Sequence, residues 1–124
     1  KSMAEFGKRS EECLESCDER IQLVLREAIK HYDFAVIKGH RGEEEQNEAF
    51  NSGNSQLKFP LSKHNQHPSK AVDVVPYPVD WDNQARFKTL AQVIKGSAEK
   101  VGVEDIHWGY DLWQWDAPHW QLGK

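Results

Sequence analysis

One carboxylate, Asp73, lies inside an otherwise apolar run, Ala71-Val72-Asp73-Val74-Val75. Moving a charged carboxylate out of water costs a large free energy unless the group is paired or binds a metal ion. A buried strand at this position therefore predicts a functional partner for Asp73. The alternation of side chains along a strand leaves a second interpretation open, in which Asp73 faces solvent while Val72 and Val74 point inward.

Two histidines are candidate partners for that carboxylate. His64 lies in the polar stretch before the apolar run, and His119 lies near the C-terminus. Two imidazoles and one carboxylate form a common catalytic zinc site, which activates a water molecule as a nucleophile. Because the chain contains six histidines, spacing alone leaves other sets open, and His64 with His67 is one of them.

Three helices are predicted from apolar residues that recur at helical spacing. The first has Ser10 as its N-cap, with acidic residues in its first turn, and ends near Lys30. The second spans 43–50, and the third begins after a cap formed by Asp80 or Asp82.

Four short apolar runs are predicted to be strands. They cover 34–37, 71–75, 106–108 and 119–122. The polar stretch 54–70 is predicted to be a long loop, and such a loop in a compact domain is often functional. Together these elements predict an α+β fold with about three helices and a small, mainly antiparallel sheet.

Size, charge and cysteine content limit the class of protein. A chain of 124 residues is too short for two cores, so one domain is expected over 3–124. Lys1 and Ser2 precede Met3 and are interpreted as residues left by cloning. The two cysteines, Cys13 and Cys17, are too few for a disulfide framework and are interpreted as ordinary helix positions. A net charge of −4 without a basic stripe argues against a nucleic-acid partner.

The sequence also lacks the patterns of membrane insertion. No apolar run approaches the roughly 20 residues that a membrane span needs, and the N-terminus lacks the basic-then-apolar pattern of a secretory signal. We therefore expect no stable membrane association and initial retention in a cytoplasm. Since no long apolar face demands a partner subunit, we also expect a monomer.

Three segments around Asp73 resemble the phage L-alanyl-D-glutamate endopeptidases. They are Ser62-Lys63-His64-Asn65, Pro68-Ser69-Lys70-Ala71-Val72-Asp73 and Pro76-Tyr77-Pro78-Val79-Asp80-Trp81. These enzymes belong to the D-Ala-D-Ala carboxypeptidase family of zinc peptidases, which shares its metal-site plan with the hedgehog signalling domain. The family pattern is Ser-x-His, then Ala-x-Asp, and later Asp-x-x-His.

The resemblance extends over nearly the whole chain, from about Phe6 to Leu122. Phe6-Gly7-Lys8-Arg9-Ser10 matches the usual opening of the phage enzymes, and Gly39-His40-Arg41-Gly42 matches their substrate-arginine motif. The spacer before Asp73 is longer than the tightest family spacing, with Pro68 where a glycine is common. The resemblance as a whole implies a fold like that of the hedgehog domain and the DD-peptidases.

The resemblance implies a role for each residue that matches a motif. Zinc would be held by His64, Asp73 and His119. Asp116 would act as the general base that takes a proton from water and later protonates the leaving amine, and its alternative is a turn-forming aspartate beside Pro118.

Arg41 matches the family's substrate arginine. It would hold a substrate carboxylate with its forked guanidinium. The alternative is a surface ion pair with Glu43, Glu44 or Glu45.

The aromatic residues near the C-terminus have two interpretations. Trp108 and Trp120 are expected in the core, because a small domain must bury its large side chains. Trp115, next to Asp116, is the candidate for the wall of a substrate groove, and Tyr110 and Trp113 lie in the same aromatic loop.

The implied protein is a phage endolysin that hydrolyses the L-Ala–D-Glu bond of peptidoglycan stem peptides for host lysis. It would stay in the host cytoplasm until another factor opens the membrane, and would then act on the cell wall from the periplasm. Two alternatives remain, a D-Ala-D-Ala carboxypeptidase or dipeptidase with the same metal site, and a non-catalytic, metal-stabilised wall-binding module.

Asp111 and Asp116 are the only acids in 108–116, which argues against a regulatory calcium ion.

Overall fold

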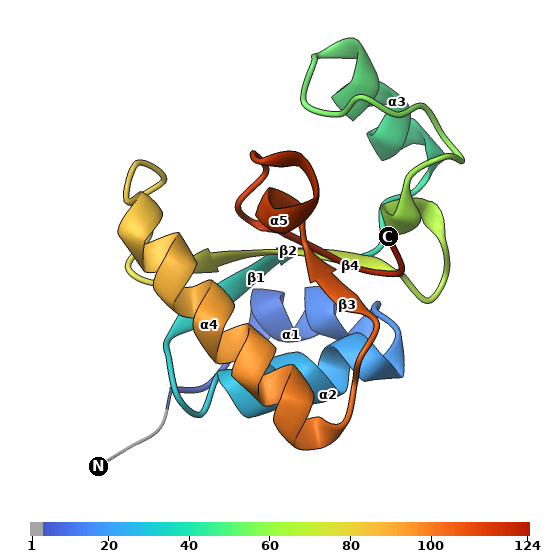
Figure 1. Cartoon of the computed structure of the whole chain (residues 1–124). Coiled ribbons are helices and arrows are strands. Elements are labelled where there is room, and N and C mark those ends of the chain that lie inside the picture. The colour runs from blue at the N-terminus through green and yellow to red at the C-terminus, as the bar shows by residue number, and fades with distance from the viewer. Residues whose placement is uncertain (1–3) are drawn as a thin grey trace.

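The centre of the fold is a sheet of four antiparallel strands in the order β1-β2-β4-β3 (Figure 1). The computed structural model describes residues 4–124, and the predicted cloning residues Lys1 and Ser2 lie outside this range. The strands are β1 (Phe34–Lys38), β2 (Ala71–Pro76), β3 (Ile106–Trp108) and β4 (His119–Leu122). All four predicted strands are therefore confirmed, as is the mainly antiparallel sheet.

Five α-helices and one 3-10 turn surround this sheet. They are α1 (Lys8–Glu15), α2 (Glu19–Ala28), α3 (Glu43–Asn51), η1 (Lys63–Asn65), α4 (Gln84–Val101) and α5 (Gly109–Trp113). In Figure 1, α1 and α2 lie on one side of the sheet, α5 lies on the other, and α3 projects away from the body. None of the helices within residues 4–124 has the length and apolar character needed to cross a membrane.

The two faces of the sheet have different tasks because side chains alternate along each strand. Val72 and Val74 of β2 and Trp120 of β4 belong to the core that packs against α2 and α4. Asp73, which lies between Val72 and Val74, and His119, which precedes Trp120, face the opposite side of the sheet. The core therefore holds the strands whose other face carries the polar residues.

The first predicted helix is two helices, and this part of the prediction is wrong. Ser10 is not an N-cap but lies buried inside α1, where its hydroxyl accepts a hydrogen bond from the backbone N–H of Val36. The helix is interrupted after Glu15, and α2 begins at Glu19 because the Asp18 side chain caps it by accepting from the N–H of Arg20. Cys13 is a helix position as predicted, but the prediction is wrong for Cys17, which lies in the break and forms an isolated parallel β-bridge with Ser69. Both cysteines are free thiols.

Two further details of the helices differ from the prediction. The side chain of Asn83, not that of Asp80 or Asp82, caps α4 by accepting from the N–H of Arg86. The helix ends at Gly102, whose φ of 80° suits the left-handed position that closes a helix. Helix α5 occupies part of the predicted aromatic loop. Together with the division of the first helix into α1 and α2, it gives five α-helices instead of about three.

The packing of α2 against α4 gives a direct test of the fold. Leu25 of α2 is fully buried in the core, whereas Leu23 on the same helix is 53% exposed. We expect Leu25→Ala to lower the free energy of unfolding by about 2–5 kcal/mol, because it leaves a cavity. The matched control, Leu23→Ala, should change it by no more than about 0.5 kcal/mol. Urea denaturation of both variants measures the difference, and equal effects would contradict this packing.

Candidate metal centre and substrate cleft

His64, Asp73 and His119 meet at one point on the polar side of the sheet. Each offers one ligand atom, and these three atoms lie within 4.8 Å of one another. The Oδ1 atom of Asp73 is 3.5 Å from Nε2 of His64 and 3.3 Å from Nδ1 of His119. Asp73 and His119 are direct partners in the pairing of β2 with β4, so their side chains share one face. The predicted triad is thus brought together, with His64 contributed by η1.

The remaining ring nitrogen of each histidine has an acceptor. Nδ1 of His64 lies 2.8 Å from the carbonyl oxygen of Gly39, and Nε2 of His119 lies 2.9 Å from Oε1 of Gln121. The amide nitrogen of Gln121 donates to the carbonyl of Gly123, which fixes the orientation of this side chain. These acceptors hold a ring proton on the nitrogen that faces away from Asp73. The nitrogen that faces Asp73 can donate to the carboxylate when the imidazole is protonated, and it can present a lone pair to a cation when the imidazole is neutral.

The set of donors fits a zinc ion. Two imidazole nitrogens and one carboxylate oxygen, with the tautomers held by acceptors behind them, are what a catalytic zinc site with an open fourth position requires. Among the described residues this is the only group of three or more potential ligands that lies so close together. His67, the alternative partner of His64, is exposed and packs edge to face on His40 instead.

Asp73 is charged because its two histidine neighbours outweigh its burial. Burial by itself would raise the pKa of the Asp73 carboxyl, but hydrogen bonds from His119 and His64 hold this pKa well below its usual range. For His119, burial would lower the pKa, yet the hydrogen bond with Asp73 raises it. The interpretation in which Asp73 faces bulk solvent is therefore wrong, since the carboxylate points at the two imidazoles.

Asp116 lies on the turn that leads into β4, close to the triad. Its backbone has a φ of 61°, and its carbonyl oxygen accepts from the N–H of His119. The side chain is half-buried at the cleft, and this burial raises the pKa of its carboxyl. A raised pKa increases the affinity of this carboxylate for a proton, which suits a group that accepts a proton and returns it.

Gly109 allows this turn to approach β4. A Cβ atom at Gly109 would lie 2.7 Å from the carbonyl oxygen of Asp116 and 3.0 Å from the Cβ of His119. Any larger residue would therefore displace the backbone that carries Asp116 or the candidate ligand His119. Sequence analysis missed this glycine, although its place between β3 and the aromatic stretch was a signal of close backbone approach.

Arg41 reaches the same cleft from the segment between β1 and α3. Its NH2 group lies 4.0 Å from Oδ2 of Asp73, and its NH1 group donates to Oε1 of Gln46. Among the described residues, none of the ion pairs joins Arg41 to 43–45, and Glu45 pairs with Lys38. The surface ion-pair alternative for Arg41 is therefore wrong.

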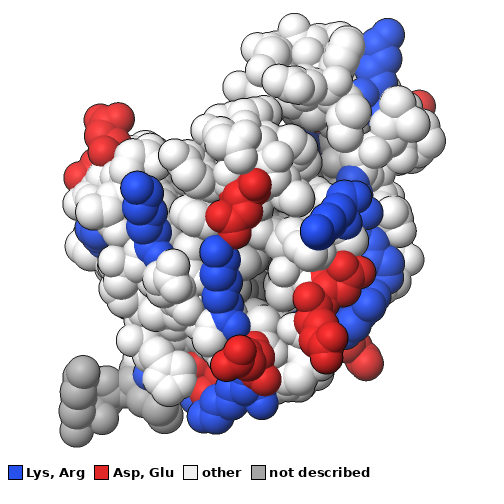
Figure 2. Space-filling model, in the orientation of Figure 1, with Lys and Arg blue, Asp and Glu red and all other residues white. Residues whose placement is uncertain are grey.

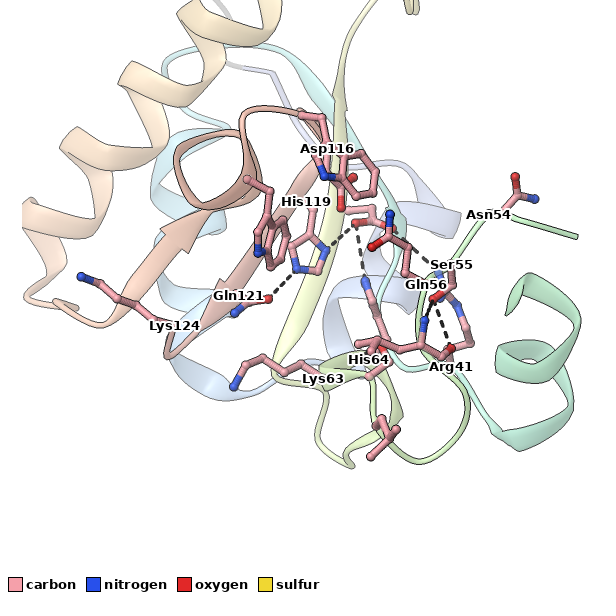
Figure 3. A pocket seen from close by; sticks show the side chains of 16 residues that line it. Arg41, Asn54, Ser55, Gln56, Lys63, His64, Asp116, His119, Gln121 and Lys124 are labelled. Atoms are coloured by element: carbon pink, nitrogen blue, oxygen red, sulfur yellow. Dashed lines mark hydrogen bonds and ion pairs between the residues drawn. The ribbon is translucent and has the colours of Figure 1, made fainter. Parts of the chain in front are cut away.

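The triad lines a cleft of about 470 Å³. In Figure 3, Arg41, Ser55 and Gln56 lie on one side of the two histidines, and Lys63 and Lys124 lie on the other. On the face drawn in Figure 2, basic and acidic side chains are interspersed and form no continuous patch of one sign. Positive charge for binding an anionic ligand is therefore local, and it is supplied by Arg41, Lys63 and Lys124, which line the cleft.

Two exposed tryptophans complete the wall beside His119. Trp115, the predicted groove residue, is 51% exposed and lines the cleft. Trp113 lines it as well, with its ring 5.5 Å from that of His119. Trp108 and Trp120 are buried in the core, as predicted.

The close approach at Gly109 generates a test of the metal centre. We expect Gly109→Ala to weaken zinc binding about 10- to 100-fold, as changes that disturb the orientation of ligands do. Gly96→Ala in α4 is the matched control, since a Cβ there meets nothing within 4 Å. It should keep zinc affinity and stabilise the helix by about 0.5–1 kcal/mol. Calorimetric zinc titration of both variants checks this, and unchanged affinity in Gly109→Ala would refute the geometry.

Known proteins supply an independent comparison. The sequence model of a family described as phage L-alanyl-D-glutamate peptidase matches residues 3–120. The solved structure of a Serratia marcescens L-Ala D-Glu endopeptidase, ChiX, is similar, with a TM-score of 0.80 and 30% sequence identity. The match covers 95% of this chain and 90% of that one. No curated protein matches the chain. The predicted resemblance is confirmed, and the chain belongs to the phage L-alanyl-D-glutamate peptidase family.

Proposed function

We propose that this L-Ala–D-Glu endopeptidase works with a zinc ion held by His64, Asp73 and His119. The observation that carries the proposal is the convergence of these three ligand atoms within 4.8 Å, beside a half-buried carboxylate. When bound, zinc would act as a Lewis acid that polarises the scissile carbonyl and activates water. The chain's own residues must then move the proton and hold the substrate.

Asp116 is the group that we assign to proton transfer. Its carboxylate would take a proton from the attacking water as the new C–O bond forms. It would return that proton to the nitrogen of D-Glu as the amide C–N bond breaks, which releases a neutral amine. The raised pKa of Asp116 supports this role, because it brings the affinity of the carboxylate for protons closer to the working pH.

Arg41 is the group that we assign to substrate binding. The nitrogen of the D-Glu residue is part of the scissile bond. D-Glu has two carboxyl groups, and one of them forms the next amide bond of the stem peptide. The other carboxyl is free and lies near the bond that is cut. The Arg41 side chain is 15% exposed at the cleft, and its guanidinium can donate hydrogen bonds to such a carboxylate.

The apolar wall and the charges of the cleft suit a peptide with little bulk around the scissile bond. Trp113 packs beside His119 and Trp115 packs beside Trp113, and both offer flat surfaces to the cleft, which Leu57 also lines. We assign Trp115 to this wall as a contact for the substrate.

The biological setting follows from the family and remains part of the proposal. We propose a monomeric endolysin that stays in the host cytoplasm until the membrane is opened and then cleaves the wall from the periplasm. The description of the family as phage peptidases supports this setting. Of the alternatives, a non-catalytic wall-binding module is disfavoured by Asp116, because a structural metal site has no use for a base beside an open position.

The substitution Asp116→Asn separates catalysis from metal binding. We expect a loss of about 10²- to 10⁴-fold in kcat on purified peptidoglycan, because the amide cannot accept the proton. The zinc content should stay near that of the wild type, since Asp116 is not among the three ligands. His119→Ala is the control that should lose both zinc and activity. Full lytic activity in Asp116→Asn would contradict the assigned role, and zinc without lytic activity in the wild type would favour the binding module.

A further inference from the structure

Gln46 is a fully buried polar side chain beside the substrate cleft. It belongs to α3, and its exposed fraction is 0% although α3 projects from the body of the protein. Burying an amide is unfavourable unless its hydrogen bonds are made. The role of Gln46 must therefore be sought in its partners.

All four hydrogen-bonding positions of this amide are used. Oε1 accepts from NH1 of Arg41 at 3.0 Å and from Nδ2 of Asn65 at 3.1 Å. The amide nitrogen donates to the hydroxyl of Ser55 and to the carbonyl of Leu57, both on the rim of the cleft. Because a guanidinium only donates, the oxygen of Gln46 must face Arg41, and this orientation is unambiguous.

The same network reaches the metal centre. Asn65 also donates to the backbone carbonyl of Arg41, and the backbone N–H of Arg41 donates to the carbonyl of His64. The backbone of Arg41 is thus tied to η1, which carries a metal ligand, while its guanidinium is tied to Gln46. With two anchors, the direction of the side chain relative to the triad is set.

The neutrality of Gln46 matters as much as its position. A carboxylate at this point would form an ion pair with Arg41 and would compete with a substrate carboxylate for the guanidinium. Gln46 orients the cation without placing a second carboxylate beside it, in addition to Asp73 at 4.0 Å. The nearby acids 43–45 are exposed, and none of them forms an ion pair with Arg41 among the described residues.

We infer that Gln46 is a positioning residue that aims Arg41 at the free carboxylate of D-Glu, and that it sets the enzyme's preference for a carboxylate over an amide at this position. The inference rests on the proposed function, in which Arg41 binds that carboxylate. Gln46 itself does not touch the substrate in this account, because it is wholly buried.

The test compares two synthetic stem peptides that differ only in the free carboxyl of D-Glu, which is a carboxylate in one and a primary amide in the other. Gln46→Met keeps the volume of the side chain but removes its hydrogen bonds. We expect it to raise KM for the carboxylate peptide about tenfold, with kcat nearly unchanged, and to leave KM for the amide peptide unaltered. Gln46→Glu should raise KM for the carboxylate peptide at least as much, because the new charge neutralises Arg41.

Controls separate this role from a general loosening of the rim. Asn47→Ala removes from the same helix the acceptor for the N–H of Phe59, two residues beyond Leu57, and should not change the ratio of the two KM values. In an Arg41→Ala background, adding Gln46→Met should have no further effect on KM, since Gln46 acts through Arg41. Thermal melting and zinc content confirm that each variant is folded.

The outcomes distinguish the inference from the function on which it rests. If the wild type cleaves L-Ala–D-Glu but Gln46→Met raises KM equally for both peptides, or adds to Arg41→Ala, then Gln46 is merely structural and the inference is wrong. If the wild type does not distinguish the two peptides, Arg41 does not bind this carboxylate and the inference also fails. If the wild type cleaves neither peptide, the proposed function itself fails.

Discussion

The site depends on one electrostatic arrangement, the Asp73 carboxylate held between two imidazoles on the polar face of the sheet. Its oxygen lies 3.3 Å from His119 and 3.5 Å from His64, and these contacts outweigh the cost of burial. The arrangement requires β2 and β4 to pair in one register, because a slip by one residue would move Asp73 to the apolar face. The core of α2, α4 and the sheet fixes this register, so packing on one face determines chemistry on the other.

Around this centre, segments that are distant in sequence form the cleft from two sides. The turn that carries Asp116 approaches β4 closely because position 109 is a glycine. On the other side, Gln46 ties the rim of the cleft to Arg41. The side chain of Arg41 and the backbone of Asp116 are thus held in place before substrate binds. Such preorganisation reduces the entropy that substrate binding and catalysis would otherwise cost.

Local signals predicted much of this structure, and long-range contacts account for the rest. The four strands were predictable because their apolar runs are short and bounded, and Asp73 was conspicuous because it interrupts one of them. The break before α2 was missed because apolar residues recur at helical spacing on both sides of it. The Asp18 cap is local, but the same carboxylate also pairs with Lys70 far along the chain. Gln46 and Gln121 carry no motif of their own. Only the alternation of β4 places Gln121 on the same face as His119, and nothing local distinguishes Gln46 from an exposed helix residue.

The most direct test of the central claim is product analysis by mass spectrometry on a defined stem peptide, with the protein first stripped of metal and then supplied with zinc. This account predicts no cleavage by the stripped protein. With zinc restored, it predicts one fragment that ends in L-Ala and one that begins with D-Glu. Cleavage at full rate without metal, or release of free D-Ala in place of these fragments, would contradict it.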